Sequence, residues 1–426
     1  MKILFISVSC PYPTTGGGAQ RTSMLLRGLQ RVGETHLFLL QQESSVSEEA
    51  KQYLTDQYNL VGMKPIPKHG ERSILRYVRP LAPTLVDRLV HNLGNVAKEL
   101  LPAPELQQDV FKLIEREKYD LVVCRLEGIA LAVATWDVVP TIVDIDNYTV
   151  QVYAQRVAQS NGNPLAKWIL NRHYNNLANS MPGILKKARH LWVSTEADKN
   201  ALDHPSVSVL SNIPFRELDA SDGDGNKSST MNAEPAVNSS RLLMVGSLDY
   251  AVNIEGLNIF LQKVWPMVFK KRPDAVLNIV GRGASKALIE RWSSIEGVNF
   301  IGFVDELKSV YRDCSYAIAP VFAGGGTKIK VLEALFNNRT CVVARHSMRG
   351  YEDVLEHDDS VLVADGLEQM AEHCIRLIES PETRDRLAER GAELVQKHYS
   401  YGSFVGEISR SVSELDSTVD CTDVQK

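Results

Sequence analysis

The chain has 426 residues, of which 44% are hydrophobic and 23% charged, and its formal net charge at pH 7 is −5. This length predicts two or three domains with buried cores, and the acidic balance argues against a nucleic-acid partner. The six cysteines include no Cys-x-x-Cys pair, which favours reduced thiols over a disulfide framework or a zinc site. No stretch reaches the roughly 18 apolar residues that a membrane span needs. We therefore expect a cytoplasmic protein.

Short apolar runs alternate with longer amphipathic segments in the first half of the chain. It opens with a predicted strand over 2–8, a Gly-rich loop at 14–18 and a helix over 19–31. Further strands of this half are predicted at 35–40, 121–124, 141–145 and 191–194. Strands that alternate with helices indicate a parallel sheet covered on both faces.

The pattern stops at a polar, small-residue stretch and then restarts. Strands of the second half are predicted at 241–245, 275–280, 299–301, 316–319 and 341–344. The predicted organisation is a Rossmann-like domain over 1–215, a flexible linker or loop over 216–240, a second Rossmann-like domain over 241–400, and a terminal helix with a polar tail over 401–426. This is an α/β fold, and we expect its ligand in a cleft between the two domains, beyond the carboxyl ends of the strands.

The segment from Gly324 to Glu333 carries the most specific signal for a ligand site. Its three successive glycines let backbone N–H groups approach a ligand, and the helix that follows adds a partial positive charge that suits a phosphate. Lys328 and Lys330 place cations in the first turn, where they oppose the helix dipole unless an anion binds nearby. A glycine-rich surface turn with a Lys–Glu pair on a solvated helix face is the alternative.

The helix after these glycines is predicted to have two faces. Ile329, Leu332 and Phe336 recur at helical spacing and should bury one side. Lys330 and Glu333 share another side, which predicts that Glu333 looks into the same cleft, one turn deeper. A carboxylate at that depth can accept two hydrogen bonds from vicinal ribose hydroxyls.

Polar side chains also follow two predicted strands of the first domain. Asp144 and Asp146 come at the end of the strand over 141–145, where one carboxylate can orient or deprotonate an acceptor hydroxyl. Ordinary turn chemistry explains them equally well. The same two interpretations hold for Arg125 and Glu127 after the strand over 121–124.

A basic, amphipathic segment lies at 68–91. Its basic residues, among them Lys68, Arg72, Arg76, Arg79, Arg88 and His91, are interleaved with apolar ones. The pattern is typical of peripheral contact with the inner, anionic membrane surface near a lipid-linked acceptor. A solvated pair of amphipathic helices is the alternative interpretation.

Several of these segments together resemble one known family. The run Gly-Gly-Gly-Thr-Lys-Ile-Lys-Val-Leu-Glu-Ala-Leu at 324–335, followed by 338–343, resembles the donor-site motif of retaining GT-B glycosyltransferases of family 4. The runs at 242–253, 277–281 and 298–305 are similar to that family too, as is the N-terminal stretch ending in Gly-Gly-Gly-Ala-Gln-Arg21. The nearest subgroup contains sugar transferases from exopolysaccharide gene clusters. The resemblance implies the GT-B fold, in which two Rossmann-like domains face each other across a cleft.

The resemblance also implies a role for each matching residue. Glu333 would hold the ribose, and Gly17 and Gly18 would close over the diphosphate and the acceptor. The residues that would bind the diphosphate and the sugar are Lys328, Lys330 and the backbone N–H groups of Gly325, Gly326 and Thr327. Those around the nucleotide base and the end of the first strand of the second domain are Gly246, Phe303 and Val304. No metal or other cofactor is expected, because lysines and helix-terminal donors would stabilise the leaving diphosphate.

The predicted function is transfer of a hexose-type sugar from a nucleoside-diphosphate sugar to a glycan or lipid-linked acceptor. Retention of configuration follows from the resemblance alone. The residues predicted to carry the chemistry are Asp144, Asp146, Lys328 and Glu333. Two departures concern the donor sugar: Gly325 stands where many relatives carry a glutamate, and Ser247 stands where many carry an arginine. A GT-B sugar-nucleotide epimerase and a catalytically degenerate nucleotide-sugar-binding protein remain as alternatives.

Overall fold

The computed structural model describes residues 1–14, 16–66, 103–160, 164–214, 240–304 and 306–417. The chain divides into two compact units, one formed by Met1–Leu210 with Val405–Lys426 and the other by Ser211–Phe404. The C-terminal segment thus belongs with the first unit, although the whole second unit separates the two in the sequence. The basic segment over 68–91 lies outside the described residues, as does the predicted linker over 216–240 except for Ser240.

The first unit is built on a parallel sheet with the strand order β3-β2-β1-β4-β5-β6-β7 within the described residues. Its strands are β1 (Lys2–Ser7), β2 (Glu34–Leu39), β3 (Leu60–Met63), β4 (Leu121–Arg125), β5 (Thr141–Ile145), β6 (His190–Val193) and β7 (Val207–Val209). In the central pairs, Phe5 of β1 lies opposite Leu37 of β2 and Val123 of β4. Central strands of such a sheet are apolar on both faces, because helices cover each side. Ile3 to Ile6 are accordingly fully buried.

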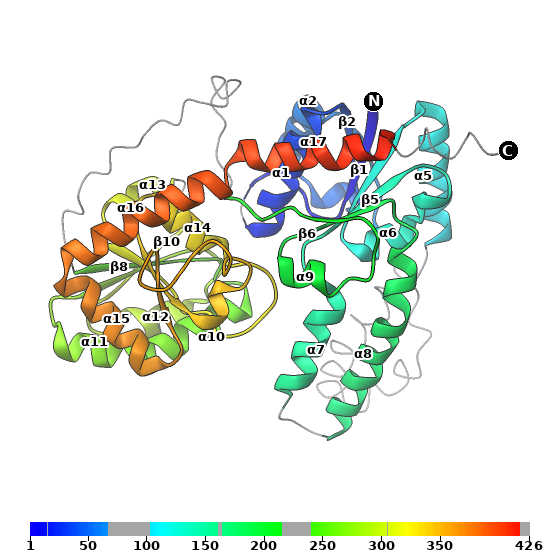
Figure 1. The fold of residues 1–426 in the computed structure, drawn as a ribbon. Coiled ribbons are helices and arrows are strands. Elements are labelled where there is room, and N and C mark those ends of the chain that lie inside the picture. The colour runs from blue at the N-terminus through cyan, green and yellow to red at the C-terminus, as the bar shows by residue number, and fades with distance from the viewer. Residues whose placement is uncertain (15, 67–102, 161–163, 215–239, 305, 418–426) are drawn as a thin grey trace. The chain divides into compact units, whose positions relative to one another are not determined.

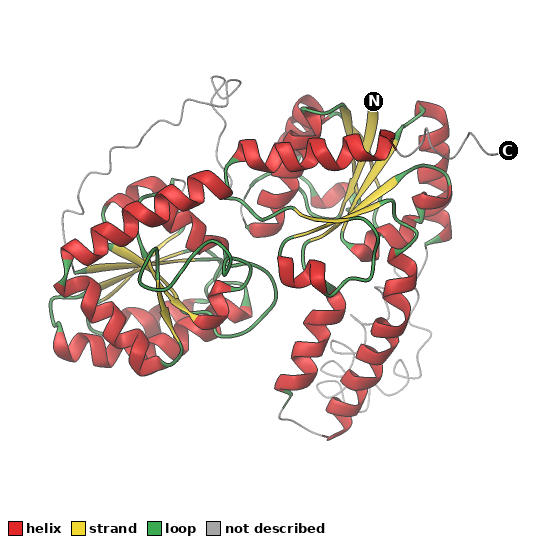
Figure 2. Ribbon diagram, viewed as in Figure 1, coloured by secondary structure: helices red, strands yellow, loops and turns green. Residues whose placement is uncertain are grey.

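Helices lie on both faces of this sheet (Figures 1 and 2). They are α1 (Gly17–Gln30), α2 (Glu48–Tyr58), α5 (Pro104–Glu117), α6 (Glu127–Val133), α7 (Thr149–Gln159), α8 (Pro164–Leu185), α9 (Glu196–Asn200) and α17 (Tyr401–Ser417), with short 3₁₀ turns η1 (Glu43–Ser45) and η3 (Thr135–Asp137). Ser411 of α17 meets Ser208 of β7, with their hydroxyl oxygens 3.2 Å apart. This contact between side chains 203 positions apart ties α17 to the edge of the first sheet.

The second unit repeats the design with the parallel strand order β10-β9-β8-β11-β12-β13 among the described residues. Its strands are β8 (Arg241–Val245), β9 (Val276–Val280), β10 (Val298–Gly302), β11 (Tyr316–Ala319), β12 (Cys341–Ala344) and β13 (Leu362–Ala364). Its helices are α10 (Ala251–Ile259), the π-helical turn η4 (Phe260–Val264), α11 (Trp265–Lys271), α12 (Lys286–Ser293), α13 (Leu307–Arg312), α14 (Ile329–Phe336), η5 (Arg345–Met348), α15 (Leu367–Glu379) and α16 (Pro381–His398).

Strand order reverses once in each sheet, and this reversal fixes where a ligand fits. In the second unit the chain runs outward from β8 through β9 to β10, and then from β11 through β12 to β13 on the other side. In sheets of this kind ligands bind at the carboxyl ends of such neighbouring strands, which makes the loops after β8 and β11 the expected ligand-binding loops. Both loops carry residues that the sequence singled out.

No helix within the described ranges is long and apolar enough to cross a bilayer. The five cysteines in those ranges, Cys10, Cys124, Cys314, Cys341 and Cys374, are all free thiols.

Candidate functional site

The loop between β11 and α14 is the centre of the candidate site. It follows the buried strand Tyr316–Ala319 and leads into α14, which begins at Ile329. Gly324 and Gly326 have φ angles of 97° and 70°, a left-handed conformation that glycine adopts without steric cost. The first turn of α14 has no side-chain cap, so its N–H groups keep their hydrogen-bonding capacity for a ligand.

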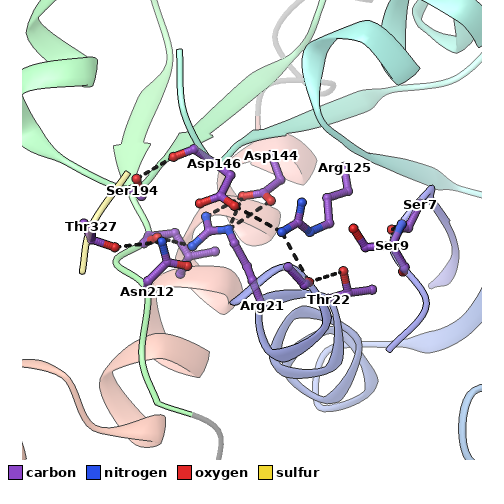
Figure 3. A network of polar contacts seen from close by, with 12 residues as sticks. Ser7, Ser9, Arg21, Thr22, Arg125, Asp144, Asp146, Ser194, Asn212 and Thr327 are labelled. Atoms are coloured by element: carbon purple, nitrogen blue, oxygen red, sulfur yellow. Dashed lines mark hydrogen bonds and ion pairs between the residues drawn. The ribbon is translucent and has the colours of Figure 1, made fainter. Parts of the chain in front are cut away.

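Hydrogen bonds from the side chains of three residues hold this loop in place. The Nε2–H of His346 donates to the carbonyl of Gly324 at 2.6 Å. The hydroxyl of Ser347 donates to the carbonyls of Ala319 and Val321 at the end of β11. The side-chain amide of Asn212 donates to the hydroxyl of Thr327 at 3.0 Å (Figure 3). These bonds preorganise the glycine turn, which lowers the entropic cost of binding a ligand there.

Lys328 is buried within this turn rather than exposed on it. Its side chain is only 8% exposed, and its ammonium donates to the carbonyls of Gly325 and Gly326 at 2.7 and 2.8 Å. Burial, together with the nearby charges of Lys330 and Arg349, lowers its pKa to about 8. Among the described residues Lys328 forms no ion pair. Lys328, Lys330 and Arg349 therefore place three positive charges near one another around this turn, with no carboxylate paired to Lys328 in the described part of the chain.

Lys330 points from α14 toward the loop after β8. Its ammonium donates to the side-chain oxygen of Asn253 at 2.9 Å, and its residue is 8% exposed. A Cβ atom placed on Gly246 would lie 2.9 Å from this ammonium, so only glycine leaves room for it. Burial lowers the pKa of Lys330 to about 8, whereas the charge of Glu333 raises it.

Glu333 lies one turn further along α14, as predicted, and its side chain is half-buried. The rest of the helix is more deeply packed than the two-faced pattern indicated. Val331 and Leu335 are fully buried along with Leu332, because α14 lies between its sheet and α16. Lys330 is correspondingly buried and does not lie on a solvated face.

The loops after β8, β9 and β10 pack against one another beside this turn. Gly281 approaches so closely that a Cβ atom there would lie 1.9 Å from the carbonyl oxygen of Gly246. The Gly-Arg-Gly segment at 281–283 is therefore explained by loop packing. Phe303 follows the edge strand β10 and is 55% exposed, and Val304 beside it is half-buried.

The predicted residues of the first unit take part in a polar network (Figure 3). The guanidinium of Arg21 binds the carboxylate of Asp144 through Nε at 3.0 and 3.1 Å, and through Nη2. Both side chains are almost fully buried. Nη1 of Arg21 donates to the carbonyl of Leu210 at 3.0 Å. The expectation that Asp144 faces an acceptor is wrong in this structure, because its carboxylate is buried and already neutralised.

Asp146 is more accessible, with 19% of its side chain exposed, and it accepts a hydrogen bond from Arg125 at 3.2 Å. Arg125 also lies 3.4 Å from the carbonyl of Gly18. Gly17 and Gly18 are exposed, but the prediction that they lie in the loop over 14–18 is wrong, because they form the start of α1. Glu127 is buried and accepts a hydrogen bond from the backbone N–H of Thr149, which fits a structural role for this carboxylate.

Sequence reasoning missed two partners that complete these sites. Asn253 was considered only as part of the run at 242–253 that resembles the family. A polar residue in the first turn of the helix after β8 could have predicted a partner for a ligand or for a nearby lysine. Arg21 shares the inner side of α1 with Met24 and Leu25, and a charge on a buried helix face predicts a buried partner. In the described part of the chain, no group of three or more His, Cys, Asp or Glu side chains is placed to hold a metal ion.

Comparison with known families decides the class of this site. Residues 239–380 match the model of the family Glycosyl transferases group 1. The chain is a glycosyltransferase. The matched residues include β8, the loop after β11 and the whole of α14, so the family match falls on the candidate donor site.

Relatives of this glycosyltransferase cover nearly its full length. An uncharacterised 44.6 kDa protein from the cps region of Klebsiella pneumoniae is 25% identical over 415 residues, which cover 93% of this chain and 96% of that protein. The structure of Anabaena HepE in complex with UDP has a TM-score of 0.64 at 14% identity, over 97% of this chain and 100% of that one. Sucrose-phosphate synthase from Thermosynechococcus elongatus has a TM-score of 0.64 at 13% identity, over 98% and 99% of the two chains. The GT-B fold of the glycosyltransferase is thereby confirmed.

Proposed function

We propose that this glycosyltransferase moves a sugar from a nucleoside-diphosphate sugar to a glycan or lipid-linked acceptor during synthesis of a cell-surface polysaccharide. The observation that carries the proposal is the burial of Lys328 and Lys330 without an ion pair among the described residues. Burying an ammonium without a carboxylate is costly, and an anionic ligand offsets that cost. Anabaena HepE has been solved with UDP and with UDP-glucose, and the Klebsiella relative comes from a cps region.

In this proposal each part of the donor contacts a different part of the second unit. Lys328, Lys330 and the first N–H groups of α14 hold the diphosphate. Glu333, one turn deeper, accepts hydrogen bonds from the ribose hydroxyls. The base lies beside Phe303 and Val304, where an exposed ring after the edge strand β10 offers an apolar surface.

The chemistry follows from this placement of charge. As the bond between sugar and diphosphate breaks, negative charge grows on the leaving phosphate oxygens. Two buried ammonium groups and helix N–H donors stabilise that charge without having to reorganise. We infer from this arrangement a mechanism without a metal ion.

Retention of configuration is proposed from the resemblance to retaining relatives. In the first unit, Asp146 orients the acceptor hydroxyl or removes its proton.

Calorimetric titration with UDP, GDP and ADP tests the site assignment. Glu333→Ala should weaken binding of the preferred nucleoside diphosphate by roughly 10- to 100-fold, because it removes hydrogen bonds to a charged group. Glu372→Ala, which changes an exposed carboxylate on α15, is the matched control and should leave affinity unchanged. Equal affinities for the wild type and Glu333→Ala would mean that the ribose binds elsewhere.

A further inference from the structure

The hairpin formed by α7 and α8 in the first unit has a charge pattern unlike the rest of the chain. From Thr149 to Lys187 the sequence contains five lysine and arginine residues and no aspartate or glutamate. The whole chain, by contrast, has 47 basic and 52 acidic residues. This hairpin is therefore a cationic element on an acidic protein, and nothing in the proposed transfer reaction requires it.

The two ends of the hairpin have different surroundings. Near the sheet, Tyr153, Leu177, Met181 and Leu185 are buried in the core of the first unit. Beyond them α7 and α8 run side by side and extend away from the sheet (Figure 1). The half near the sheet is thus fixed by packing, while the far half carries side chains that are exposed among the described residues.

We call Arg156, Lys167, Trp168 and Arg172 the hairpin tip. Trp168 is 56% exposed, the largest exposed fraction of any large hydrophobic side chain in the described residues. The guanidinium of Arg172 lies 5.6 Å from the centre of its ring. Within the described ranges the three cations of the tip form no ion pair. Nearer the sheet, Lys186 differs because it pairs with Asp203 at 2.6 Å.

We propose that the hairpin tip docks on the surface of an anionic lipid bilayer. An indole ring gains from the boundary between water and hydrocarbon, where its apolar body is buried and its N–H stays solvated. Lysine and arginine beside it can lay their aliphatic stems along the same boundary and pair with lipid phosphates. Duplex DNA explains the cations but not the exposed ring, because its bases are already stacked, and the net negative charge of the chain opposes a long polyanion. The proposal does not depend on the sugar that is transferred.

Intrinsic fluorescence of the full chain gives a direct test. Trp192, Trp265 and Trp292 are buried, so Trp168 is the tryptophan most open to a change of environment. Vesicles of phosphatidylcholine with phosphatidylglycerol should shift the emission to shorter wavelength, and vesicles of phosphatidylcholine alone should not. Trp168→Phe should abolish the shift. A shift that persists in Trp168→Phe, or that is equal for both kinds of vesicle, would overturn the proposal.

Vesicle flotation tests the charges with a matched control. The triple variant Arg156→Gln/Lys167→Gln/Arg172→Gln should bind anionic vesicles on the order of 100-fold more weakly, since each cation near the surface contributes roughly fivefold. The control Lys263→Gln/Lys270→Gln/Lys271→Gln removes the same charge from exposed positions of the second unit and should bind like the wild type. Equal losses in both variants would contradict a site at the tip, as would binding to duplex DNA without binding to vesicles. Circular dichroism confirms folding of each variant.

Discussion

The ammonium of Lys330 donates a hydrogen bond to the side-chain oxygen of Asn253 at 2.9 Å. This bond joins α14 to α10, the helices that follow β11 and β8 at the point where the strand order of the second sheet reverses. An amide oxygen orients the ammonium but leaves its charge unneutralised. Gly246 lies against the same ammonium, which occupies the space that a side chain at this position would need. The pair therefore keeps a fixed positive charge beside the loops after β8 and β11, which the group 1 family match covers.

Removing that charge should weaken donor binding more than it alters stability. Lys330→Met keeps most of the aliphatic stem but loses the charge, so we expect nucleoside-diphosphate affinity to fall by roughly 10- to 100-fold. Stability should hold or rise, because the ligand-free protein no longer buries an unpaired cation. Calorimetry and thermal unfolding measure the two effects. Lys263→Met, on an exposed turn, is the control, and an affinity loss of the same size there would contradict the assignment.

Nucleotide binding should depend on pH through the same lysines. Burial holds the pKa of Lys328 and Lys330 to about 8, below the ordinary value of 10.5. The protonated forms bind phosphate, so affinity should fall as pH rises through 8, by about tenfold per lysine between pH 7 and pH 9. In the ligand-free protein the unfolded chain binds more protons between pH 8 and 10.5, so the free energy of unfolding should rise with pH there. Affinity that stays constant from pH 7 to pH 9 would contradict a role for these ammonium groups.

The buried pair of Arg21 and Asp144 should matter for stability. Arg21→Ala leaves the carboxylate of Asp144 buried without a partner, which should cost about 3–5 kcal/mol of unfolding free energy. Lys186→Ala is the matched control in the same unit, because its pair with Asp203 is exposed and should contribute only about 0–1 kcal/mol. Chemical denaturation of the full chain, monitored with a spectroscopic probe in the first unit, compares the two variants. Similar small losses for both would show that the buried pair does not hold this unit together.

Substitutions of Asp146 and Asp144 should have different effects, the first on catalysis and the second on folding stability. Asp146→Asn keeps the size of a partly exposed side chain, so we expect nucleotide affinity to hold while turnover falls by roughly 100-fold or more. Asp144→Asn should instead lower stability, because it removes the charge that Arg21 binds. Turnover of labelled donor, calorimetry and thermal unfolding distinguish the outcomes. Full turnover in Asp146→Asn would remove this carboxylate from the proposed mechanism.

Much of the fold was predictable because its strands are short apolar runs that end in glycine or polar residues. The strands at 141–145, 241–245, 316–319 and 341–344 lie where the sequence predicts them. The edge strands β3, β7 and β13 were not predicted, because β7 and β13 have only three residues each and Gly62 interrupts the apolar run of β3. The assignment of α17 to the first unit was also beyond the sequence, since a helix pattern does not tell which sheet it packs on.

The candidate site was predictable in location but not in detail. Glycine spacing and helix periodicity placed Lys328, Lys330 and Glu333 together without any structure. Periodicity did not show that both lysines are buried, because the neighbours that cover them come from distant segments. The pairing of Arg21 with Asp144 joins side chains 123 positions apart, and adjacent residues in the sequence carry no signal for it. Asp144 was therefore predicted to face an acceptor, whereas its neighbour Asp146 keeps that role as a proposal.

Transfer of labelled sugar tests the central claim most directly. The full chain would be incubated with labelled UDP-, GDP- and ADP-sugars and a lipid extract from polysaccharide-producing cells, beside the Lys330→Met variant and the control Lys263→Met. We predict that one donor labels the lipid or glycan fraction in the wild type and the control, and that Lys330→Met loses at least 90% of this label, in line with roughly tenfold or greater weakening of donor binding. A wild type that binds a nucleoside diphosphate tightly but transfers no sugar from any donor, or a Lys330→Met variant that transfers at the full rate, would contradict the account.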